Sequence, residues 1–499
     1  MVASDAPRFR DSAVVVLVRG HGRDLETFWV KRSDEVAVMP GFQAFPGGKV
    51  SAEDSELEFE DAADLPDRAL RACALREAFE ETGVLAGLAA PVAIDALEPA
   101  RHRLLAEETS FPALQREHGW RFRAGALAYA GRWQTPPFAT TRFDATYYLV
   151  RVPEGQSPSI RVGELASGEW TTPAAAMERY RRGEVAFAAP ILWTLDALAA
   201  GEDGLAERLA RGPGRAATPV QRIELKWGIV LHPMKTRPLP PATHTNAYLI
   251  GEREMALIDP GSGEPAALEK LFALIDSLGA EGRRLAIVLA SHHHPDHVGG
   301  VDGVRERYRV PVGAHRQTAV QMRVDRVLDD GERIALEPGA GEWSLRAIHT
   351  PGHARGHLCF IHPRTGSLFC GDHIPGGAGT VIIDPPEGNM AAYVRSLERL
   401  RDEPIETLFP GHGSPQGAAR RRIEWLISHR RKREALVLAA LGEAPEALDA
   451  LVARAYRDTP TELWGYAERS LLAHLEKLEA EGRAARAGER WRRLAPDDD

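Results

Sequence analysis

Four groups able to bind a divalent cation lie within six residues in the C-terminal half of the sequence. They are His292, His294, Asp296 and His297, in the segment Ser291-His292-His293-His294-Pro295-Asp296-His297. Imidazole and carboxylate groups clustered in this way suit zinc-type ions. Two adjacent cations would lower the pKa of a water held between them and stabilise charge on the attacked and leaving oxygens. The chemistry expected here is hydrolysis.

Three further residues of the same types follow downstream, each beside a glycine. They are His353 in His-Thr-Pro-Gly-His, Asp372 in Cys-Gly-Asp-His and His412 in Pro-Gly-His-Gly. A glycine permits a turn that brings a ligand close to a metal ion. We expect His293, which stands between two candidate ligands, to point away from the metals. Contact with substrate stays open for His357 and His373.

This ordered set resembles the ligand set of the metallo-β-lactamase superfamily, in which a His-x-His-x-Asp-His motif is followed by His, Asp and His. The resemblance implies an αββα sandwich that binds two Zn²⁺ ions. It implies that His292, His294 and His353 hold one ion, that Asp296, His297 and His412 hold the other, and that Asp372 bridges them. Asp296 and Asp372 are then the catalytic candidates. Asp259, at an expected strand end, matches a family aspartate that is not usually a direct ligand.

A second candidate site lies in the N-terminal half, on an expected helix over 70–82. Glu77, Glu80 and Glu81 stand at positions i, i+3 and i+4, so they share one helix face. Three like charges there are destabilising unless a cation or the adjacent Arg76 neutralises them. A hard divalent cation, Mg²⁺ or Mn²⁺, is the expected partner. The pattern therefore predicts a second metal site, independent of the first.

The segment Arg76-Glu77-Ala78-Phe79-Glu80-Glu81-Thr82-Gly83-Val84, with Phe45-Pro46-Gly47-Gly48-Lys49 before it, resembles the Nudix box. The resemblance implies an α/β/α sandwich in which Glu77, Glu80 and Glu81 bind metal and support attack on a diphosphate. Glu53 follows Gly47 at the family's interval, but an acidic insertion over 53–67 separates it from Arg76. This insertion and the segments 133–137, 142–144 and 168–170 resemble the branch that acts on coenzyme A esters. An inactive scaffold is the alternative.

The chain after His412 is first basic and then helical. The run over 420–434 fits either a solvated helix face or a phosphate-contacting surface from which His429 and Arg430 reach the substrate. Short helices are expected over 436–442, 448–456 and 471–481, with a basic hairpin ending at 491–493. This tail resembles a winged helix, and its position resembles that in the lactamase-β-like protein 2 family. That family includes an endoribonuclease acting on single-stranded RNA.

The helices and strands expected around these residues predict an α/β multidomain protein. Strands expected over 12–18, 27–31 and 144–151 place the glutamate helix in one α/β domain over 1–200, which the resemblance implies is a Nudix domain. A Gly/Ala/Arg/Pro-rich stretch predicts a linker over 201–221. Strands are expected over 246–250, 255–258 and 285–290 and a helix over 265–278, within a domain over 222–434 for which the resemblance implies the metallo-β-lactamase fold. The small, helical winged-helix-like tail occupies 435–499.

Composition limits the class of partner and the cellular compartment but identifies no substrate. The 62 Lys and Arg and 71 Asp and Glu are well mixed, with a net charge of −9, so no whole-chain charge indicates a polyanion partner. Cys73, Cys359 and Cys370 form no CxxC pair, suit a reducing compartment and are expected in the core. The apolar run over 13–18 is far shorter than the roughly 18 residues needed to span a bilayer. We expect a cytoplasmic protein without membrane contact.

The leading hypothesis is a bifunctional hydrolase. Its Nudix half would hydrolyse the diphosphate of a nucleotide or coenzyme A ester, and its dinuclear zinc half would hydrolyse an ester, thioester or phosphodiester. A second hypothesis makes the C-terminal half an endoribonuclease on single-stranded RNA, with the Nudix half as a binding module. A third treats the N-terminal half as a non-catalytic sensor of a nucleotide or coenzyme A ester that regulates its neighbour.

Overall fold

The computed structural model describes residues 9–62, 65–139, 141–212, 222–337, 343–377 and 379–494. The chain divides into two compact units, Met1–Val230 and Leu231–Asp499, and the division falls within strand β9. Part of the predicted linker, 213–221, lies outside the described residues, as do 63–64 of the predicted insertion. No helix of the described residues is both long and apolar enough to cross a membrane.

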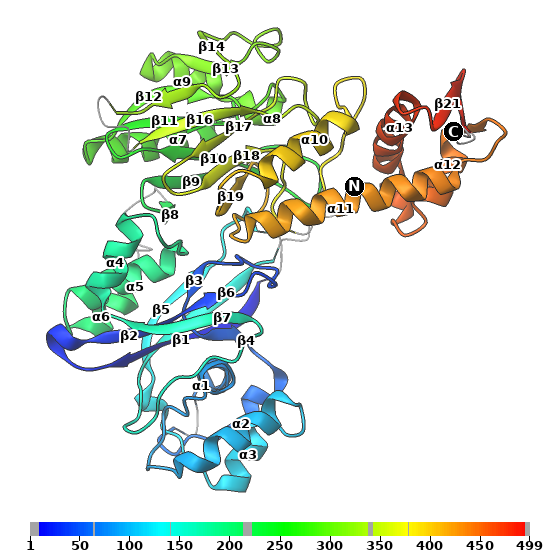
Figure 1. The fold of residues 1–499 in the computed structure, drawn as a ribbon. Coiled ribbons are helices and arrows are strands. Elements are labelled where there is room, and N and C mark those ends of the chain that lie inside the picture. The colour runs from blue at the N-terminus through cyan, green and yellow to red at the C-terminus, as the bar shows by residue number, and fades with distance from the viewer. Residues whose placement is uncertain are drawn as a thin grey trace. The chain divides into compact units, whose positions relative to one another are not determined.

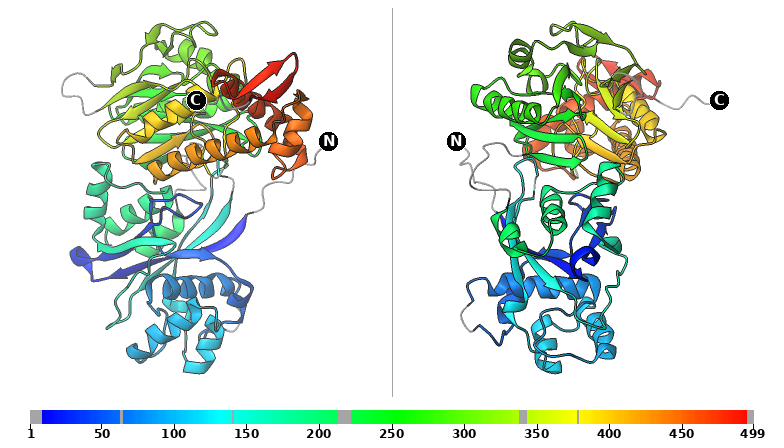
Figure 2. Two further views of the ribbon diagram at one scale, coloured as in Figure 1. Left: turned by 45° about the vertical axis from the view of Figure 1, so that its right-hand side comes forward. Right: turned by 90° about the vertical axis from the view of Figure 1, so that its left-hand side faces the viewer.

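The first unit is a sheet covered by helices on both faces (Figures 1 and 2). Its strands run in the order β3-β2-β1-β6-β5, with β4 paired to β1 and β7 paired to β2. The strands are β1 (Arg10–Arg19), β2 (Glu26–Arg32), β3 (Gln43–Ala44), β4 (Gly47–Lys49), β5 (Ala128–Gln134), β6 (Phe143–Arg151) and β7 (Leu165–Thr171). The helices are α1 (Arg68–Thr82), α2 (Leu97–Leu105), α3 (Phe111–His118), α4 (Pro173–Arg181), α5 (Ala189–Ala199) and α6 (Leu205–Arg211), with short 3₁₀ turns at η1 (Gly22–Asp24), η2 (Ala52–Glu56), η3 (Ile94–Ala96) and η4 (Ala124–Ala126).

The alternating side chains of β1 explain why helices cover both faces. Val15 and Leu17 belong to the core cluster that includes α1, α2 and α3, whereas Val16 and Val18 belong to the cluster that includes α4 and α5. Successive side chains of a strand point to opposite faces, so an unbroken apolar run in β1 serves two cores. The strands predicted over 12–18, 27–31 and 144–151 correspond to β1, β2 and β6.

Two further sheets have the order β14-β13-β12-β11-β10-β9-β8 and β15-β16-β17-β18-β19, and all of their strands except β8 and the start of β9 lie in the second unit. The first sheet comprises β8 (Ile223–Lys226), β9 (Ile229–Lys235), β10 (His244–Ile250), β11 (Glu254–Ile258), β12 (Arg284–Leu289), β13 (Val312–His315) and β14 (Arg326–Leu328). The second comprises β15 (Arg333–Ala335), β16 (Ser344–His349), β17 (Leu358–His362), β18 (Ser367–Gly371) and β19 (Thr407–Pro410). The helices beside them are α7 (Pro265–Ala280), α8 (Pro295–Val298), α9 (Val301–Tyr308) and α10 (Met390–Arg401).

Aromatic contacts hold the two sheets face to face. The ring of Tyr248 on β10 lies 5.2 Å from that of Phe369 on β18 and 5.6 Å from that of Phe409 on β19. Helices α7 and α9 lie outside the first sheet and α10 outside the second (Figure 1). The αββα sandwich predicted for this half is therefore confirmed.

A long helix, α11 (Ala419–Ala440), leads from the sandwich into the tail (Figure 1). The tail adds α12 (Leu448–Ala455), η5 (Thr461–Leu463), α13 (Trp464–Ala480) and a small sheet of β20 (Glu446–Ala447), β21 (Ala484–Ala487) and β22 (Arg490–Arg493). The helix expected over 436–442 is instead the end of α11, because no glycine or proline interrupts the run before it. Val437 of α11 packs with Leu451, Leu475 and Trp491 in the tail core.

Candidate metal centres

The histidine cluster begins where β12 ends. Pro295 occupies the first turn of the short helix α8, a position where the missing proline N–H costs no helical hydrogen bond. The extended segment before this helix carries His292 and His294, and the helix itself carries Asp296 and His297. His292 and His297 are fully buried. The strand end and the turn of helix thus direct four polar side chains towards one point.

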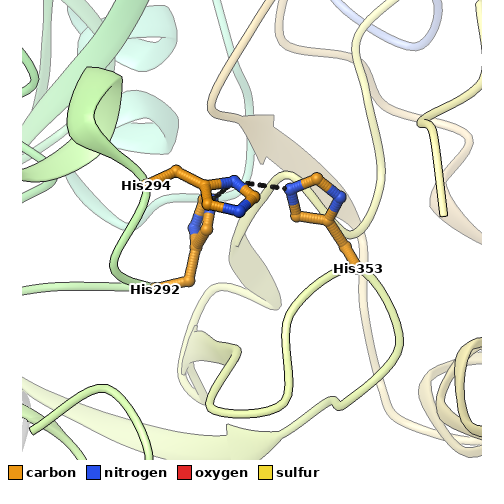
Figure 3. A group of neighbouring side chains, drawn as sticks. All are labelled: His292, His294 and His353. Atoms are coloured by element: carbon orange, nitrogen blue, oxygen red, sulfur yellow. Dashed lines mark hydrogen bonds between the residues drawn. The ribbon is translucent and has the colours of Figure 1, made fainter. Parts of the chain in front are cut away.

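Three imidazoles meet on one side of this point, as Figure 3 shows. The Nε2 atom of His292 lies 2.9 Å from Nδ1 of His294, and Nε2 of His353 lies 3.0 Å from the same Nδ1 atom. These three nitrogens come from two segments separated by more than fifty residues of sequence. They form one of the groups whose ligand atoms all lie within 4.8 Å of one another.

A carboxylate-rich group lies directly beside the three imidazoles. His412 Nε2 is 3.2 Å from Asp296 Oδ2 and 3.3 Å from Asp372 Oδ1, and His297 Nε2 is 3.2 Å from Asp372 Oδ1. The other Asp372 oxygen, Oδ2, lies 3.6 Å from His353 Nε2. Asp372 therefore stands between the two groups, and the structure brings all seven predicted residues into one cluster.

The outer nitrogens of these rings establish which atoms face inwards. His353 Nδ1 contacts the carbonyl oxygen of Ile382 at 3.0 Å, and His412 Nδ1 contacts that of His244 at 2.9 Å. A carbonyl oxygen can only accept a hydrogen bond, so each Nδ1 carries the proton. In a neutral ring, Nε2 is then a bare lone pair aimed at the cluster.

Asp259 and Ser291 orient the two remaining Nε2 ligands in the same way. His297 Nδ1 lies 2.9 Å from Asp259 Oδ2, and Ser291 Oγ donates to the same oxygen at 2.6 Å. Ser291 Oγ therefore accepts from His292 Nδ1, 3.0 Å away. Converging lone pairs and carboxylates repel one another unless a cation lies among them, so the donor set fits a pair of divalent metal ions.

Charge in the cluster is divided between its two sides. Burial lowers the pKa of His292 well below its usual range and that of His294 to about 4. Burial opposes protonation of His412 as well, but the carboxylates of Asp372 and Asp296 outweigh it and raise its pKa to about 10. The imidazole side is thus neutral, and the carboxylate side attracts positive charge that a proton or a metal ion can supply.

The neighbouring histidines take other roles. His293 belongs to none of the candidate ligand groups among the described residues. His357 is fully buried and its Nδ1 contacts Thr350 Oγ1 at 2.9 Å, while fully buried His373 packs against the ring of Tyr393, with centroids 4.7 Å apart. Full burial keeps both rings away from a substrate arriving from solvent.

The three glutamates of α1 form a looser arrangement than the histidine cluster. Arg76 Nη1 donates to Glu77 Oε1 at 2.8 Å and to Glu80 Oε2 at 3.1 Å, while the backbone N–H of Gly47 donates to Glu81 Oε2 at 2.9 Å. Within the described part of the chain, the tight ligand groups all belong to the histidine cluster. Glu77 and Glu80 face the Arg76 guanidinium whereas Glu81 faces the Gly47 amide, so the three carboxylates do not converge on one point.

The glycine pair before α1 brings backbone against these carboxylates. A Cβ atom added at Gly48 would lie 2.3 Å from Glu77 Oε1, so only glycine permits this approach. Burial raises the pKa of Glu77 to about 7 and that of Glu81 to about 8. A cation bound at this site would offset the same cost of burying negative charge.

Asp54, which the sequence analysis missed, holds the guanidinium from the other side. Its Oδ1 accepts from Arg76 Nε at 2.8 Å and its Oδ2 from Arg76 Nη2 at 3.1 Å, whereas Glu53 is exposed. The 3₁₀ turn η2 directs Glu53 outwards and Asp54 inwards. Matching Glu53 to the box was therefore wrong, and the same interval counted from Gly48 instead of Gly47 would have found Asp54.

Replacing Asp54 with alanine is expected to destabilise the first unit by about 3 kcal/mol, because it leaves the Arg76 guanidinium buried without its bidentate partner. Glu53→Ala, one residue away on an exposed position, should change stability by less than about 0.5 kcal/mol. Differential scanning calorimetry of the full-length protein measures both. Equal effects of the two substitutions would contradict the assignment of Asp54.

The basic run after His412 is mostly turned inwards or paired. Arg430 is only 3% exposed and donates to the carbonyl of Val381, so the interpretation that it reaches the substrate is wrong. Arg433 donates to Asp458 and Arg431 pairs with Glu398. The half-buried ring of His429 stacks on Trp425, with centroids 5.2 Å apart. The positive charge of this run in the sequence is therefore divided between buried arginines and arginines paired with carboxylates.

Three family models match this chain. The model described as Metallo-beta-lactamase superfamily matches residues 240–412, the one described as Beta-lactamase associated winged helix domain matches 447–491, and the one described as NUDT19 Nudix domain matches 56–198. The matched residues include every candidate ligand described above. They confirm the sequence-based recognition of these three families.

Curated relatives match the C-terminal half. A beta-lactamase-like protein 2 homolog of Drosophila melanogaster is 32% identical over 48% of this chain and 83% of its own length. A hydroxyacylglutathione hydrolase of Methylococcus capsulatus is 37% identical over 33% of this chain and 63% of its own. A lactamase-like protein of Pestalotiopsis microspora is 33% identical over 40% of this chain, and the match spans 58% of that protein.

Proposed function

Since the chain belongs to the family of the β-lactamase-like protein 2 homologues within the metallo-β-lactamase superfamily, we propose that it is a bifunctional metal-dependent hydrolase. The C-terminal half hydrolyses a thioester at a dinuclear zinc centre, and the N-terminal half hydrolyses the diphosphate of a coenzyme A ester or nucleotide. The observation that carries the first activity is the convergence of bare imidazole lone pairs on ionised carboxylates. The likeness to a hydroxyacylglutathione hydrolase supports a thioester.

At the C-terminal centre, His292, His294 and His353 would hold one zinc ion and Asp296, His297 and His412 would hold the second, with Asp372 lying beside both groups. When bound, the two ions activate water and stabilise charge on the attacked and leaving oxygens. The chain's own part is to fix the ligands. Asp259 and the two backbone carbonyls hold the Nδ1 protons, which keeps each Nε2 atom aimed at a metal.

At the N-terminal centre, Glu77, Glu80 and Glu81 would hold Mg²⁺ or Mn²⁺, which would supply electrostatic stabilisation for the diphosphate. Arg76 compensates two of these carboxylates and is itself held by Asp54. The match to a Nudix family model supports this assignment. The buried thiols of the three cysteines, which form no disulfide, support a reducing location such as the cytoplasm.

A substrate panel tests the proposal on the full-length protein. Glutathione thioesters should be hydrolysed with Zn²⁺, and coenzyme A esters or nucleoside diphosphate derivatives should be cleaved with Mg²⁺ or Mn²⁺. Chelation should stop both reactions. Cleavage of single-stranded RNA without any thioester hydrolysis would instead assign an endoribonuclease to the C-terminal half. Binding of coenzyme A esters without cleavage would make the N-terminal half a sensor.

A further inference from the structure

Two arginines of α11 are buried without a carboxylate partner. Arg422 is 8% exposed and Arg430 is 3% exposed, and neither forms an ion pair in the part of the chain that the structure describes. Burying a guanidinium costs free energy unless its donors are satisfied. Exposed arginines of the same helix behave differently, since Arg420 pairs with Glu424 and Arg431 with Glu398. The inward pair therefore requires a structural explanation.

The Nη2 atoms of both arginines donate to backbone carbonyls between β18 and α10, whereas their buried Nε atoms have no hydrogen-bond partner among the described residues. Arg422 Nη2 donates to the carbonyl of Pro375 at 3.2 Å and to that of Gly379, and Arg430 Nη2 donates to that of Val381. The described residues of this segment form neither strand nor helix. Carbonyls outside a regular ladder need other hydrogen-bond partners, and the two guanidinium groups supply them.

This segment also orients a candidate metal ligand. Ile382, the residue after the one that Arg430 holds, presents its carbonyl oxygen to His353 Nδ1 at 3.0 Å. Ile383 is fully buried in the core cluster that contains Ile423 and Ile427 of α11. The two faces of this short stretch therefore have different partners, the helix α11 on one and the His353 ring on the other.

A second connection runs through Tyr393 of α10. The Arg430 guanidinium lies 5.1 Å from the centre of the Tyr393 ring, and the Tyr393 hydroxyl donates to the carbonyl of His373 at 3.0 Å. His373 follows Asp372 in sequence, and a Cβ atom at Gly352, the residue before His353, would lie 2.4 Å from the Tyr393 backbone. Arg430 thus packs beside the supports of two candidate ligands.

We propose that Arg430, with Arg422, is a positioning residue for the metal ligand His353. The guanidinium groups fix the stretch that carries the Ile382 carbonyl, and this carbonyl sets the tautomer and the orientation of the His353 ring. The inference rests on the proposed two-metal centre. It also gives α11 two roles, because its first turns support the metal centre and Val437 near its end packs in the tail core.

The test compares Arg430→Met with Arg431→Met in the full-length protein. Methionine keeps an apolar stem and removes every donor, and Arg431 is the next residue of the same helix, exposed and paired with Glu398. Zinc affinity is measured by competition with a chromophoric chelator, and ligand geometry by the visible spectrum of the Co²⁺-substituted protein. We expect Arg430→Met to bind one of its two zinc ions about 10- to 100-fold more weakly, with an altered Co²⁺ spectrum. Arg431→Met should match the wild type.

The outcomes separate this inference from the proposed function. If the wild type binds two zinc ions and Arg430→Met equals Arg431→Met in affinity and spectrum, the positioning role is wrong while the metal centre stands. If the wild type binds no zinc at the histidine cluster, both are wrong. Should Arg430→Met fail to fold, Arg430→Lys against Arg431→Lys decides the same question. A lysine at 430 keeps the charge but loses the planar fork, so weaker zinc binding is expected there as well.

Discussion

Replacing Asp372 with asparagine is expected to abolish thioester hydrolysis and zinc binding at the C-terminal centre together. Asp372 presents one oxygen to His297 and His412 and the other to His353, so the substitution removes charge from both metal positions at once. Removing a residue that only orients a ligand costs about 10- to 100-fold in metal affinity, and we expect a larger loss for the ligand itself. Both zinc stoichiometry and turnover should fall.

The measurement is zinc content by atomic absorption beside the initial rate of glutathione thioester hydrolysis. Asp302→Asn is the matched control, because its side chain is 92% exposed on α9 and the chemical change is identical. Hydrolysis by Asp372→Asn at the wild-type rate after removal of metal would end the two-metal proposal. Cleavage of coenzyme A esters or nucleoside diphosphates should persist in both variants, because that activity is assigned to the other unit.

Replacing Glu81 with glutamine is expected to lower diphosphate hydrolysis by about 100- to 10,000-fold, the range found when a residue that supports proton transfer or its metal is removed. The Glu81 carboxylate accepts a hydrogen bond from the Gly47 N–H. Burial and the neighbouring Glu77 carboxylate raise the pKa of Glu81. Glutamine keeps the size and the hydrogen-bond acceptor but removes the charge that attracts a cation. Thioester hydrolysis should be unchanged.

Glu178→Gln on the exposed face of α4 is the control for this substitution. Rates are measured with a coenzyme A ester and with a nucleoside diphosphate derivative, each over a titration of Mg²⁺. Wild-type rates in both Glu81→Gln and Glu80→Gln would show that the helix is not catalytic. A parallel fall in thioester hydrolysis would instead favour a regulatory N-terminal half.

The candidate ligands were predictable because their signal is local and chemical. His292 to His297 lie together in sequence, and each later ligand lies beside a glycine in a short motif. The strands and helices that carry them follow ordinary hydrophobic periodicity, and the resemblance to the metallo-β-lactamase superfamily implied the αββα sandwich. The residues that orient these ligands could not be predicted, because Ile382 and His244 act through backbone carbonyls, which every residue possesses.

Charge patterns were a weaker guide than ligand motifs. The run that contains Arg422 and Arg430 was interpreted by its net charge, yet the sequence does not say which arginines face the protein. A helix turns each successive side chain by about 100°, so neighbours such as Arg430 and Arg431 take opposite environments. The role of Asp54 was not predicted for a similar reason, since one position in a 3₁₀ turn separates a buried carboxylate from an exposed one.

Residue identity alone indicated the class of reaction, hydrolysis, and predicted a metal site in each half of the chain. This prediction was possible because imidazole and carboxylate groups are the side chains that such ions prefer as ligands. Folding decided everything that depends on a partner distant in sequence. In the folded chain, the Nε2 atom of His353 lies beside Asp372, Arg76 pairs with Asp54, and Arg430 donates to the carbonyl of Val381. Burial makes such contacts strong, and burial is a property of the packed structure.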